Sequence, residues 1–249
     1  MRPASAHTVQ FGLETVAPDD KTRKVTGVFE TVAGRYDLMN DLMSFGSHRV
    51  MKRIAVESTG LRPGGTALDL AGGTGDMAAL LAQAVGREGC VVLTDINASM
   101  MNLGRDRLID RGCNNVLFIQ ADAEALPYPD ESYDAVTIAF GLRNLTDKER
   151  GLREMHRVLK PGGRIVVLEF SKARNPIVAT VYGAFQALWP ALGRVVVGDA
   201  SPYRYLVDSI TVHPNQAALR LMIQDAGFTQ VRVDNLLSGI VAIHSGVKP

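Results

Sequence analysis

Apolar residues recur every three or four positions between Val25 and Met43, close to the start of the chain. This spacing gives one apolar stripe along a helix, so the sequence predicts an amphipathic helix that runs toward the segment MSFGSHR. The pattern ends at LRPGG, residues 61–65, because glycine and proline interrupt regular structure. We therefore expect residues 1–60 to form a helical extension or lid in front of a main domain that spans residues 61–249.

Short apolar runs alternate with helix-like segments after residue 65. The helical segments begin near Asp76, Ala98, Glu124 and Asp147, and the runs occupy residues 66–71, 90–95, 115–120, 133–140 and 164–170. KPGG, residues 160–163, predicts a helix stop and a turn before the fifth run. This alternation is typical of βαβ units, which build a parallel sheet with right-handed crossovers. Ligands of such sheets gather at the carboxyl ends of the strands.

The last third of the chain departs from this alternation. Residues 172–197 carry more aromatic and aliphatic side chains than one face of a crossover helix needs, so we expect an insertion on the substrate side near residues 172–210. Residues 228–235 and 239–244 predict a pair of antiparallel strands joined by a tight connection. The fold class that these patterns predict is α/β.

Composition excludes several function classes. The chain has 249 residues, a formal net charge of +1 and a sequence pI of about 7.8, which gives no global argument for nucleic acid. The cysteines, Cys90 and Cys113, have no paired spacing, so we expect neither a disulfide framework nor a metal site. No segment reaches the roughly 18 apolar residues that span a bilayer, and the first residues resemble no leader peptide, so we expect a cytoplasmic protein.

A glycine-rich turn follows the first apolar run, in the segment LDLAGGTGDMA, residues 68–78. From Gly73 onward it matches a dinucleotide fingerprint, yet Asp76 would face a pyrophosphate there. At about 4 Å a carboxylate and a phosphate repel by roughly 1 to 4 kcal/mol. S-adenosylmethionine has no phosphate and carries an ammonium and a sulfonium, so it suits the acidic loop better than NAD. Gly72, Gly73 and Gly75 would let the backbone approach its amino-acid end.

Acidic residues close the next strands. Asp95 follows the second run, where a carboxylate can accept from both ribose hydroxyls, and Asp122 with Ala123 follows the third, where adenine would lie. An acidic strand end is also a common helix N-cap, an alternative that applies to Asp95 and Asn97. Asp69, inside the first run, either contacts the cofactor or orients the loop by hydrogen bonds to its amides.

At this point the sequence resembles the ubiquinone/menaquinone-biosynthesis C-methyltransferases of the class I methyltransferase fold. YDLMNDLMSFGSHRVMK, residues 36–52, resembles the family's first signature, and RVLKPGGRIVVLEFS, residues 157–171, resembles its second. LDLAGGTGD and RVLKPGG alone mark only the superfamily, whereas the first signature together with FGLRN, residues 140–144, is specific. The resemblance covers nearly the whole chain. It implies a Rossmann-like, mostly parallel seven-stranded sheet with an antiparallel C-terminal strand and an N-terminal helical extension.

The resemblance also implies site residues. Thr74, Asp95, Asp122 and Ala123 fall on the family's cofactor-contact positions. Two positions depart from the family pattern: Met51 stands where tryptophan is usual, and Ala139 where serine is frequent. We expect altered packing at Met51, and at Ala139 at most a lost hydrogen bond, worth about 0.5 to 1.5 kcal/mol. The complete cofactor set we predict is Asp69, Gly72, Gly73, Thr74, Gly75, Asp76, Asp95, Ile96, Asp122, Ala123 and Ala139.

The reaction implied by the resemblance is methylation of a ring carbon of a polyprenylated benzoquinol or demethylmenaquinol, with S-adenosylhomocysteine as product and no metal. Such a site needs a base for a quinol hydroxyl and a cation or donor for the oxygen. Arg143 and Asn144 are the candidates for the oxygen, and Tyr36, His48 and His213 for the base or its relay. Alternatives stay open: Arg143 could pair with a surface acid, Asn144 could cap the helix that begins near Asp147, and the other three could serve packing.

The implied prenyl tail resides in a bilayer, so the protein must meet its substrate at a membrane surface. Residues 172–206 combine aromatic and aliphatic side chains with Lys172, Arg174, Arg194 and Arg204, a composition that suits a tail-binding lid or an interfacial patch at the inner face of the membrane. A buried crossover helix or a homodimer contact is the competing interpretation. Contact with other quinone-biosynthesis enzymes is a further alternative.

Competing functions remain. A nucleic-acid amine methyltransferase would be expected to show an Asp/Asn-Pro-Pro-Tyr loop after the fourth strand, where this chain has AFGLRN. A dehydrogenase is disfavoured by Asp76. A catalytically silent cofactor-binding subunit of a quinone-biosynthesis assembly, and a methyltransferase for another small aromatic acceptor, are left open.

Overall fold

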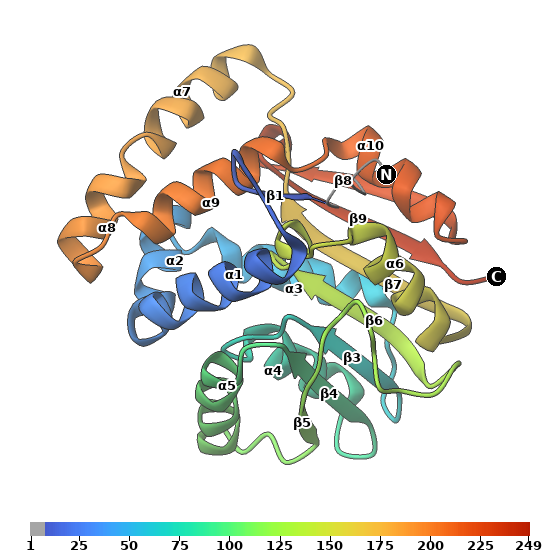
Figure 1. Ribbon diagram of the computed structural model, residues 1–249. Helices are drawn as coiled ribbons and strands as arrows, with labels where there is room; N and C mark the ends of the chain where they lie inside the picture. The colour runs from blue at the N-terminus through green and yellow to red at the C-terminus, as the bar shows by residue number, and fades with distance from the viewer. Residues whose placement is uncertain (1–7) are drawn as a thin grey trace, which may run out of the picture.

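The structure, a computed structural model, describes residues 8–249, except for the side chains of Ala33, Tyr36 and Asp37. Its centre is a seven-stranded sheet with the order β5-β4-β3-β6-β7-β9-β8 (Figure 1). Neighbouring strands from β5 to β7 pair in parallel, and β9 is antiparallel to both β7 and β8. The strands are β3 (Thr66–Leu70), β4 (Cys90–Asp95), β5 (Val116–Gln120), β6 (Tyr133–Ala139), β7 (Leu159–Phe170), β8 (Thr229–Leu236) and β9 (Val241–Val247).

Helices cover both faces of this sheet, as the βα alternation requires. One face packs against α3 (Ser47–Thr59), α4 (Asp76–Val85) and α5 (Ala98–Asp110), and the other against α6 (Lys148–Val158) and α10 (Gln216–Asp225). Alternate residues of a strand face opposite sides, so Ala67 packs with the α3 and α4 side chains while Leu68 packs with α6. The fold is therefore the three-layered α/β arrangement that the sequence predicts.

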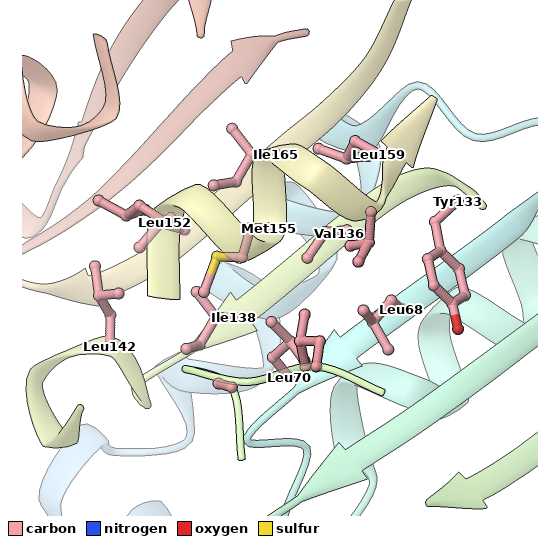
Figure 2. Close-up of a cluster of buried hydrophobic side chains, with 14 of the residues drawn as sticks. Leu68, Leu70, Tyr133, Val136, Ile138, Leu142, Leu152, Met155, Leu159 and Ile165 are labelled. Atoms are coloured by element: carbon pink, nitrogen blue, oxygen red, sulfur yellow. The ribbon is translucent and has the colours of Figure 1, made fainter. Parts of the chain in front are cut away.

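The core on the α6 face fixes the two central strands. Leu68 and Leu70 of β3 lie beside Val136 and Ile138 of β6, and Met155 of α6 covers them (Figure 2). These side chains are almost fully buried, and each contributes roughly 1.5 to 3 kcal/mol when removed from water. The carboxyl ends of β3 and β6 are consequently held rigidly next to each other.

The N-terminal region is more segmented than its apolar pattern indicates. Helices α1 (Pro18–Val32) and α2 (Tyr36–Ser44) are separated by a 3₁₀ turn, η1 (Ala33–Arg35), which contains Gly34. A single helix through residues 25–43 was expected, so this expectation is corrected. A hairpin of β1 (Val9–Phe11) and β2 (Glu14–Val16) precedes α1, and the Phe11 ring stacks on Tyr205 with centroids 4.4 Å apart.

The apolar segment after β7 forms three helices, α7 (Pro176–Gln186), α8 (Trp189–Val197) and α9 (Ser201–Val212). Figure 1 shows α7 and α8 standing out from the sheet, whereas α9 returns above α1 and α2. Trp189 of α8 is buried against Tyr203 of α9 and Met39 of α2. Among the described residues, no helix combines the length and apolar content that a bilayer crossing requires.

One local expectation was wrong, and a second is confirmed only in part. Residues near Glu124 form a turn and not a helix, because the Glu124 carboxylate accepts from the amides of Thr146 and Asp147 and connects two loops. The helix stop expected at KPGG is confirmed, since α6 ends at Val158, but KPGG itself lies within β7 where the pairing with β6 shifts register, and Gly162 has a φ of 79° there. The short 3₁₀ turns η2 (Leu142–Asn144) and η3 (Leu237–Gly239) follow β6 and β8.

Candidate functional site

The glycine-rich loop connects β3 to α4 and is packed without spare room. Gly75 has a φ of 83°, a conformation that side chains rarely adopt, and an added Cβ on Gly72 would lie 2.6 Å from Cγ of Leu93. Gly104 of α5 packs directly against the loop, since a Cβ there would lie 2.5 Å from the Gly73 carbonyl oxygen. The loop backbone is therefore exposed to ligand on one side and closely backed on the other.

Two cavities meet at this loop. The larger has a volume of about 260 Å³ and the smaller about 110 Å³. Both are lined by Phe29, Ala71, Gly73, Ala139 and Phe140, so they adjoin at the ends of β3 and β6. Phe140 has a φ of 55°, which is strained for an aromatic residue and concentrates strain at this junction. Residues of helix α1 line both cavities.

The smaller cavity gathers the acidic strand ends that the sequence singles out. Asp95 accepts from the Gly73 amide at 2.9 Å and from the Asn97 amide at 2.8 Å. Asn97, and not Asp95, caps α5, because its side chain accepts from the Met100 amide at 3.0 Å. Burial raises the pKa of Asp95 above its ordinary value. Ile96, Asp122 and Ala123 also line this cavity.

Asp69 is fully buried at the floor of the larger cavity. Its Oδ1 accepts from Thr137 Oγ1 of β6 at 2.7 Å, and its Oδ2 has no hydrogen-bond partner among the described residues. Burial raises the pKa of Asp69 to about 7, although the Thr137 hydroxyl and the Lys52 charge oppose this shift. Asp69 is thus held by a strand and keeps one oxygen for a ligand.

Asp76 has a partner that the sequence did not suggest. Lys52 Nζ of α3 lies 3.0 Å from Asp76 Oδ2, and both side chains line the larger cavity beside Thr74. Burial alone would raise the pKa of Asp76, but the Lys52 ammonium lowers it below the ordinary value. The acidic charge expected to attract the cofactor is therefore largely balanced, which leaves Asp69 as the less compensated carboxylate.

Arg143 lies in η2 and lines the larger cavity. Its Nη1 is 3.2 Å from Oε1 of Glu169, and its amide donates to Oε2 of Glu169 at 3.1 Å. The guanidinium also donates to the Phe140 carbonyl and stands over the Phe170 ring at 5.6 Å. Its Nε is buried and has no partner in the described chain. Arg143 does pair with an acid, but with a buried one in the site and not with a surface acid.

Asn144 and Tyr205 connect the two cavities. The Tyr205 hydroxyl donates to Asn144 Oδ1 at 3.0 Å, and burial raises the pKa of Tyr205 to about 12. Tyr205 lines the larger cavity and Asn144 the smaller. The N-cap of α6 is Asp147, whose side chain accepts from the Arg150 amide, so Asn144 does not serve as that cap.

The histidine candidates differ in position. His48 lines the larger cavity and is buried; burial lowers its pKa. His213 is also buried, but it lines neither cavity, its ring nitrogens have no partner among the described residues, and burial lowers its pKa to about 3. The structure therefore does not bring His213 to the site that holds Arg143 and His48. The side chain of Tyr36 lies outside the described residues.

The far part of the larger cavity is aromatic. Ring centroids follow one another from Phe140 to Phe170 at 5.0 Å, to Trp189 at 6.5 Å and to Phe185 at 5.8 Å. Phe185 stacks on Phe45 at 5.6 Å, and Phe45 is 82% exposed. This row of rings leads from the cavity junction to the surface between α2 and α7. Met51, the departure from the family pattern, is buried in the core and lines the same cavity.

These residues fit the cofactor that the sequence predicts. The buried Oδ2 of Asp69, which has no partner among the described residues, suits the ammonium group of the cofactor. Asp95 at the end of β4 suits the ribose hydroxyls. The glycines of the loop carry no side chain that would occupy the space of the ligand. In residues 8–249 no group of three or more His, Cys, Asp or Glu side chains could hold a metal ion; the expected absence of a metal stays a prediction.

Comparisons with known proteins agree with this geometry. A sequence model of the ubiE/COQ5 methyltransferase family matches residues 16–248. The ubiquinone/menaquinone biosynthesis C-methyltransferase UbiE of Ectopseudomonas mendocina is 54% identical over 244 residues, which cover 97% of this chain and 95% of the relative. UbiE of Cellvibrio japonicus is 52% identical, with 97% and 98% covered.

Solved structures show the same fold. A SAM dependent methyltransferase from Aquifex aeolicus has a TM-score of 0.58 at 20% identity and covers 79% of this chain and 89% of its own. The [4+2]-cyclase SpnF has a TM-score of 0.66 at 19% identity, with 90% and 95% covered. At this identity the likeness concerns the fold alone, as the different names of the two proteins, a methyltransferase and a cyclase, illustrate.

Proposed function

The chain belongs to the ubiE/COQ5 methyltransferase family, and from this premise we propose that it transfers a methyl group from S-adenosylmethionine to a ring carbon of a polyprenylated quinol. The acceptor is a benzoquinol, a demethylmenaquinol or both, in ubiquinone and menaquinone biosynthesis. The close relatives carry these pathways in their names.

One observation carries the proposal: a cavity lined by the strand-end carboxylates Asp95 and Asp122 adjoins a larger cavity with aromatic walls at the ends of β3 and β6. The smaller cavity suits the adenosine part of the donor, with Asp95 and Ile96 at the ribose and Asp122 and Ala123 at the adenine. The larger cavity suits the methionine part and the quinol ring. Ala139 and Phe140 line both, so the donor and the acceptor would meet there.

Bound S-adenosylmethionine supplies an electrophilic methyl group. The chain's own residues must make the quinol nucleophilic, which requires that a ring hydroxyl loses its proton and that the resulting charge on oxygen is stabilised. The methylated ring carbon must then lose its hydrogen as a proton, so that the ring becomes aromatic again. Arg143 is the proposed partner of that oxygen, because its guanidinium lines the cavity and its Nε is a buried donor without a partner in the described chain. Asn144 is the second proposed partner, and its Oδ1 accepts a hydrogen bond from Tyr205.

His48 is the proposed base. Ser44 Oγ donates to the Asn40 carbonyl at 2.6 Å, so it accepts the ring hydrogen of His48 Nδ1 at 2.8 Å. This assignment from hydrogen-bond partners leaves Nε2 of the neutral ring as the acceptor. Asp41 Oδ1 lies 3.7 Å from Nε2, close enough to stabilise the ring once it is protonated. Tyr36 remains the alternative base.

The prenyl tail would follow the row of rings from Trp189 to Phe185 and leave the protein at Phe45. Residues 175–193 contain no charged residue and are flanked by Arg174 and Arg194. Val181 of α7 is 65% exposed, and Ile177 of α7 and Val195 of α8 are exposed as well. We propose that this surface makes peripheral contact with a membrane. We also propose that residues 1–60, of which the structure describes 8–60, act as the lid, and that residues 172–210 form the substrate-side insertion.

The test is a transfer assay with isotopically methyl-labelled S-adenosylmethionine and, separately, a demethylated benzoquinol and demethylmenaquinol under reducing conditions. Label on a ring carbon of the extracted quinol supports the proposal and identifies the head group. Cofactor binding without labelled product from intact, reduced quinols would instead indicate a silent subunit or another aromatic acceptor.

A further inference from the structure

We infer that Lys52 binds the α-carboxylate of the methyl donor, so that Lys52 and Asp69 together recognise the two charged groups of its amino-acid end. This inference rests on the proposed function, which supplies the ligand. It assigns a role to a residue outside the glycine loop and the strand ends, on a helix that precedes the main sheet.

Lys52 is a buried cation at the edge of the larger cavity. It is 9% exposed and lines that cavity together with Asp69, Asp76 and Thr74. An ammonium has three hydrogen-bond donors. Lys52 Nζ has one acceptor among the described residues, Asp76 Oδ2 at 3.0 Å. Its remaining donors are therefore available to a ligand, and a buried ammonium needs such acceptors.

The local charges favour an anion beside Lys52 and a cation beside Asp69. The free Oδ2 of Asp69 lies near the loop, 3.1 Å from where a Cβ on Gly72 would stand. The Lys52 charge acts on both Asp69 and Asp76 and lowers the pKa of each relative to the effect of burial. A zwitterionic amino acid matches this pair, because its ammonium would face Asp69 and its carboxylate Lys52.

Lys52 lies on the same helix, α3, as the proposed base His48. Lys52 follows His48 by one helical turn, and both line the same cavity. A ligand carboxylate held by Lys52 would therefore be bonded to the same helix that carries His48 one turn earlier. Donor binding and placement of the proposed base would be linked by one helix.

The test compares S-adenosylhomocysteine with its decarboxylated analogue, which keeps the ammonium but lacks the carboxylate, by titration calorimetry. In Lys52→Met we expect affinity for S-adenosylhomocysteine to fall by about 10- to 100-fold, as a lost charge-assisted hydrogen bond gives, and affinity for the analogue to change by less than about threefold. Lys52→Arg keeps the charge and should retain most of the difference between the two ligands.

Arg111→Met is the matched control. Arg111 also approaches Asp76, with Nη1 3.9 Å from Oδ1, but it does not line the cavity, so its removal should leave both affinities nearly unchanged. Equal losses for both ligands in Lys52→Met, or no loss for either, would overturn the assignment, and thermal denaturation identifies a variant that has not folded. Failure of the unaltered protein to bind S-adenosylhomocysteine would overturn the proposed function itself, which separates the two outcomes.

Discussion

Glu169 holds Arg143 at the carboxyl end of the sheet through two contacts, from the guanidinium Nη1 at 3.2 Å and from the backbone amide at 3.1 Å. Both side chains are buried. A buried ion pair of this kind has a desolvation cost that its attraction barely offsets, so it is weak evidence for stability. A buried arginine that is fixed next to a cavity is better explained by what it presents to the ligand.

Arg143→Lys should lower kcat by about 100-fold or more, because lysine keeps the charge near Glu169 but loses the planar guanidinium that we propose stabilises the quinol oxygen. Affinity for S-adenosylhomocysteine should change by less than about threefold. Label-transfer kinetics and calorimetry measure the two effects separately. Arg153→Lys, a substitution on the exposed face of α6, is the control. An unchanged kcat in Arg143→Lys would remove Arg143 from the mechanism.

Binding of S-adenosylhomocysteine should weaken as the pH falls below about 7. Burial raises the pKa of Asp69 to about 7, so the free protein gains a proton there as the pH is lowered, and only the ionised carboxylate attracts an ammonium. Well below pH 7 the affinity should fall toward tenfold per pH unit. In Asp69→Asn the affinity should be low at every pH and the slope absent. A wild-type affinity that is constant between pH 5 and 8 would contradict this role of Asp69.

The sequence predicts the frame of the site well because local patterns determine it. The alternation of apolar runs predicts the parallel sheet, and the glycine-rich turn, Asp95 and Asp122 follow strands whose carboxyl ends must meet. The residues that line the cavities therefore include most of the predicted cofactor set. Their roles remain predictions, since no ligand contact tests them.

Contacts between distant segments were beyond sequence reasoning. Lys52 becomes a candidate for ligand binding only because α3 packs beside α4 and brings its side chain to Asp76, 24 positions later in the chain. Its one signal was its place at the end of the motif that begins at Tyr36. Glu169 also carried a signal, a charge in the otherwise apolar run IVVLEF. His213 shows the reverse: its residue type suggested chemistry, but it lines neither cavity.

Gly104→Ala should disrupt the glycine-rich loop from a distance. Its new Cβ would lie 2.5 Å from the Gly73 carbonyl oxygen, so either the loop or α5 must move. We expect a loss of about 1 to 3 kcal/mol in the free energy of unfolding and a weaker affinity for S-adenosylhomocysteine. In Gly183→Ala, on the exposed helix α7, nothing lies within 4 Å of the new Cβ, and both quantities should be unchanged or slightly improved. Equal behaviour of the two variants in denaturant and calorimetric titrations would refute the packing argument.

Phe185→Ala should affect long-tailed quinols selectively. Phe185 connects buried Trp189 to exposed Phe45 in the row of rings, so it lies beyond the space proposed for the head group. Loss of one aromatic contact with an apolar tail is worth roughly 1 to 3 kcal/mol, which predicts a KM raised about 5- to 100-fold for a long-chain quinol. A quinol with one isoprene unit should show little change in KM. If both substrates lose affinity equally, Phe185 acts on the head group or on folding and not on the tail.

Val181→Asp should weaken binding to vesicles of anionic phospholipid by about tenfold, because a carboxylate on the outer face of α7 must stay hydrated and repels anionic head groups. Leu221→Asp is the matched control: Leu221 is 60% exposed on α10, close to the 65% of Val181, but belongs to the part of the molecule remote from α7 and α8 in Figure 1. Sedimentation with vesicles measures both variants at two salt concentrations, since attraction through Arg174 and Arg194 should decrease as salt is added.

Sedimentation velocity without lipid then tests the alternative: if α7 and α8 instead form a homodimer, Val181→Asp will convert dimers to monomers and leave vesicle binding unchanged. Only weaker vesicle binding of Val181→Asp supports delivery of the prenyl tail from the membrane to the opening beside Phe45, because such delivery requires the apolar surface of α7 to face lipid.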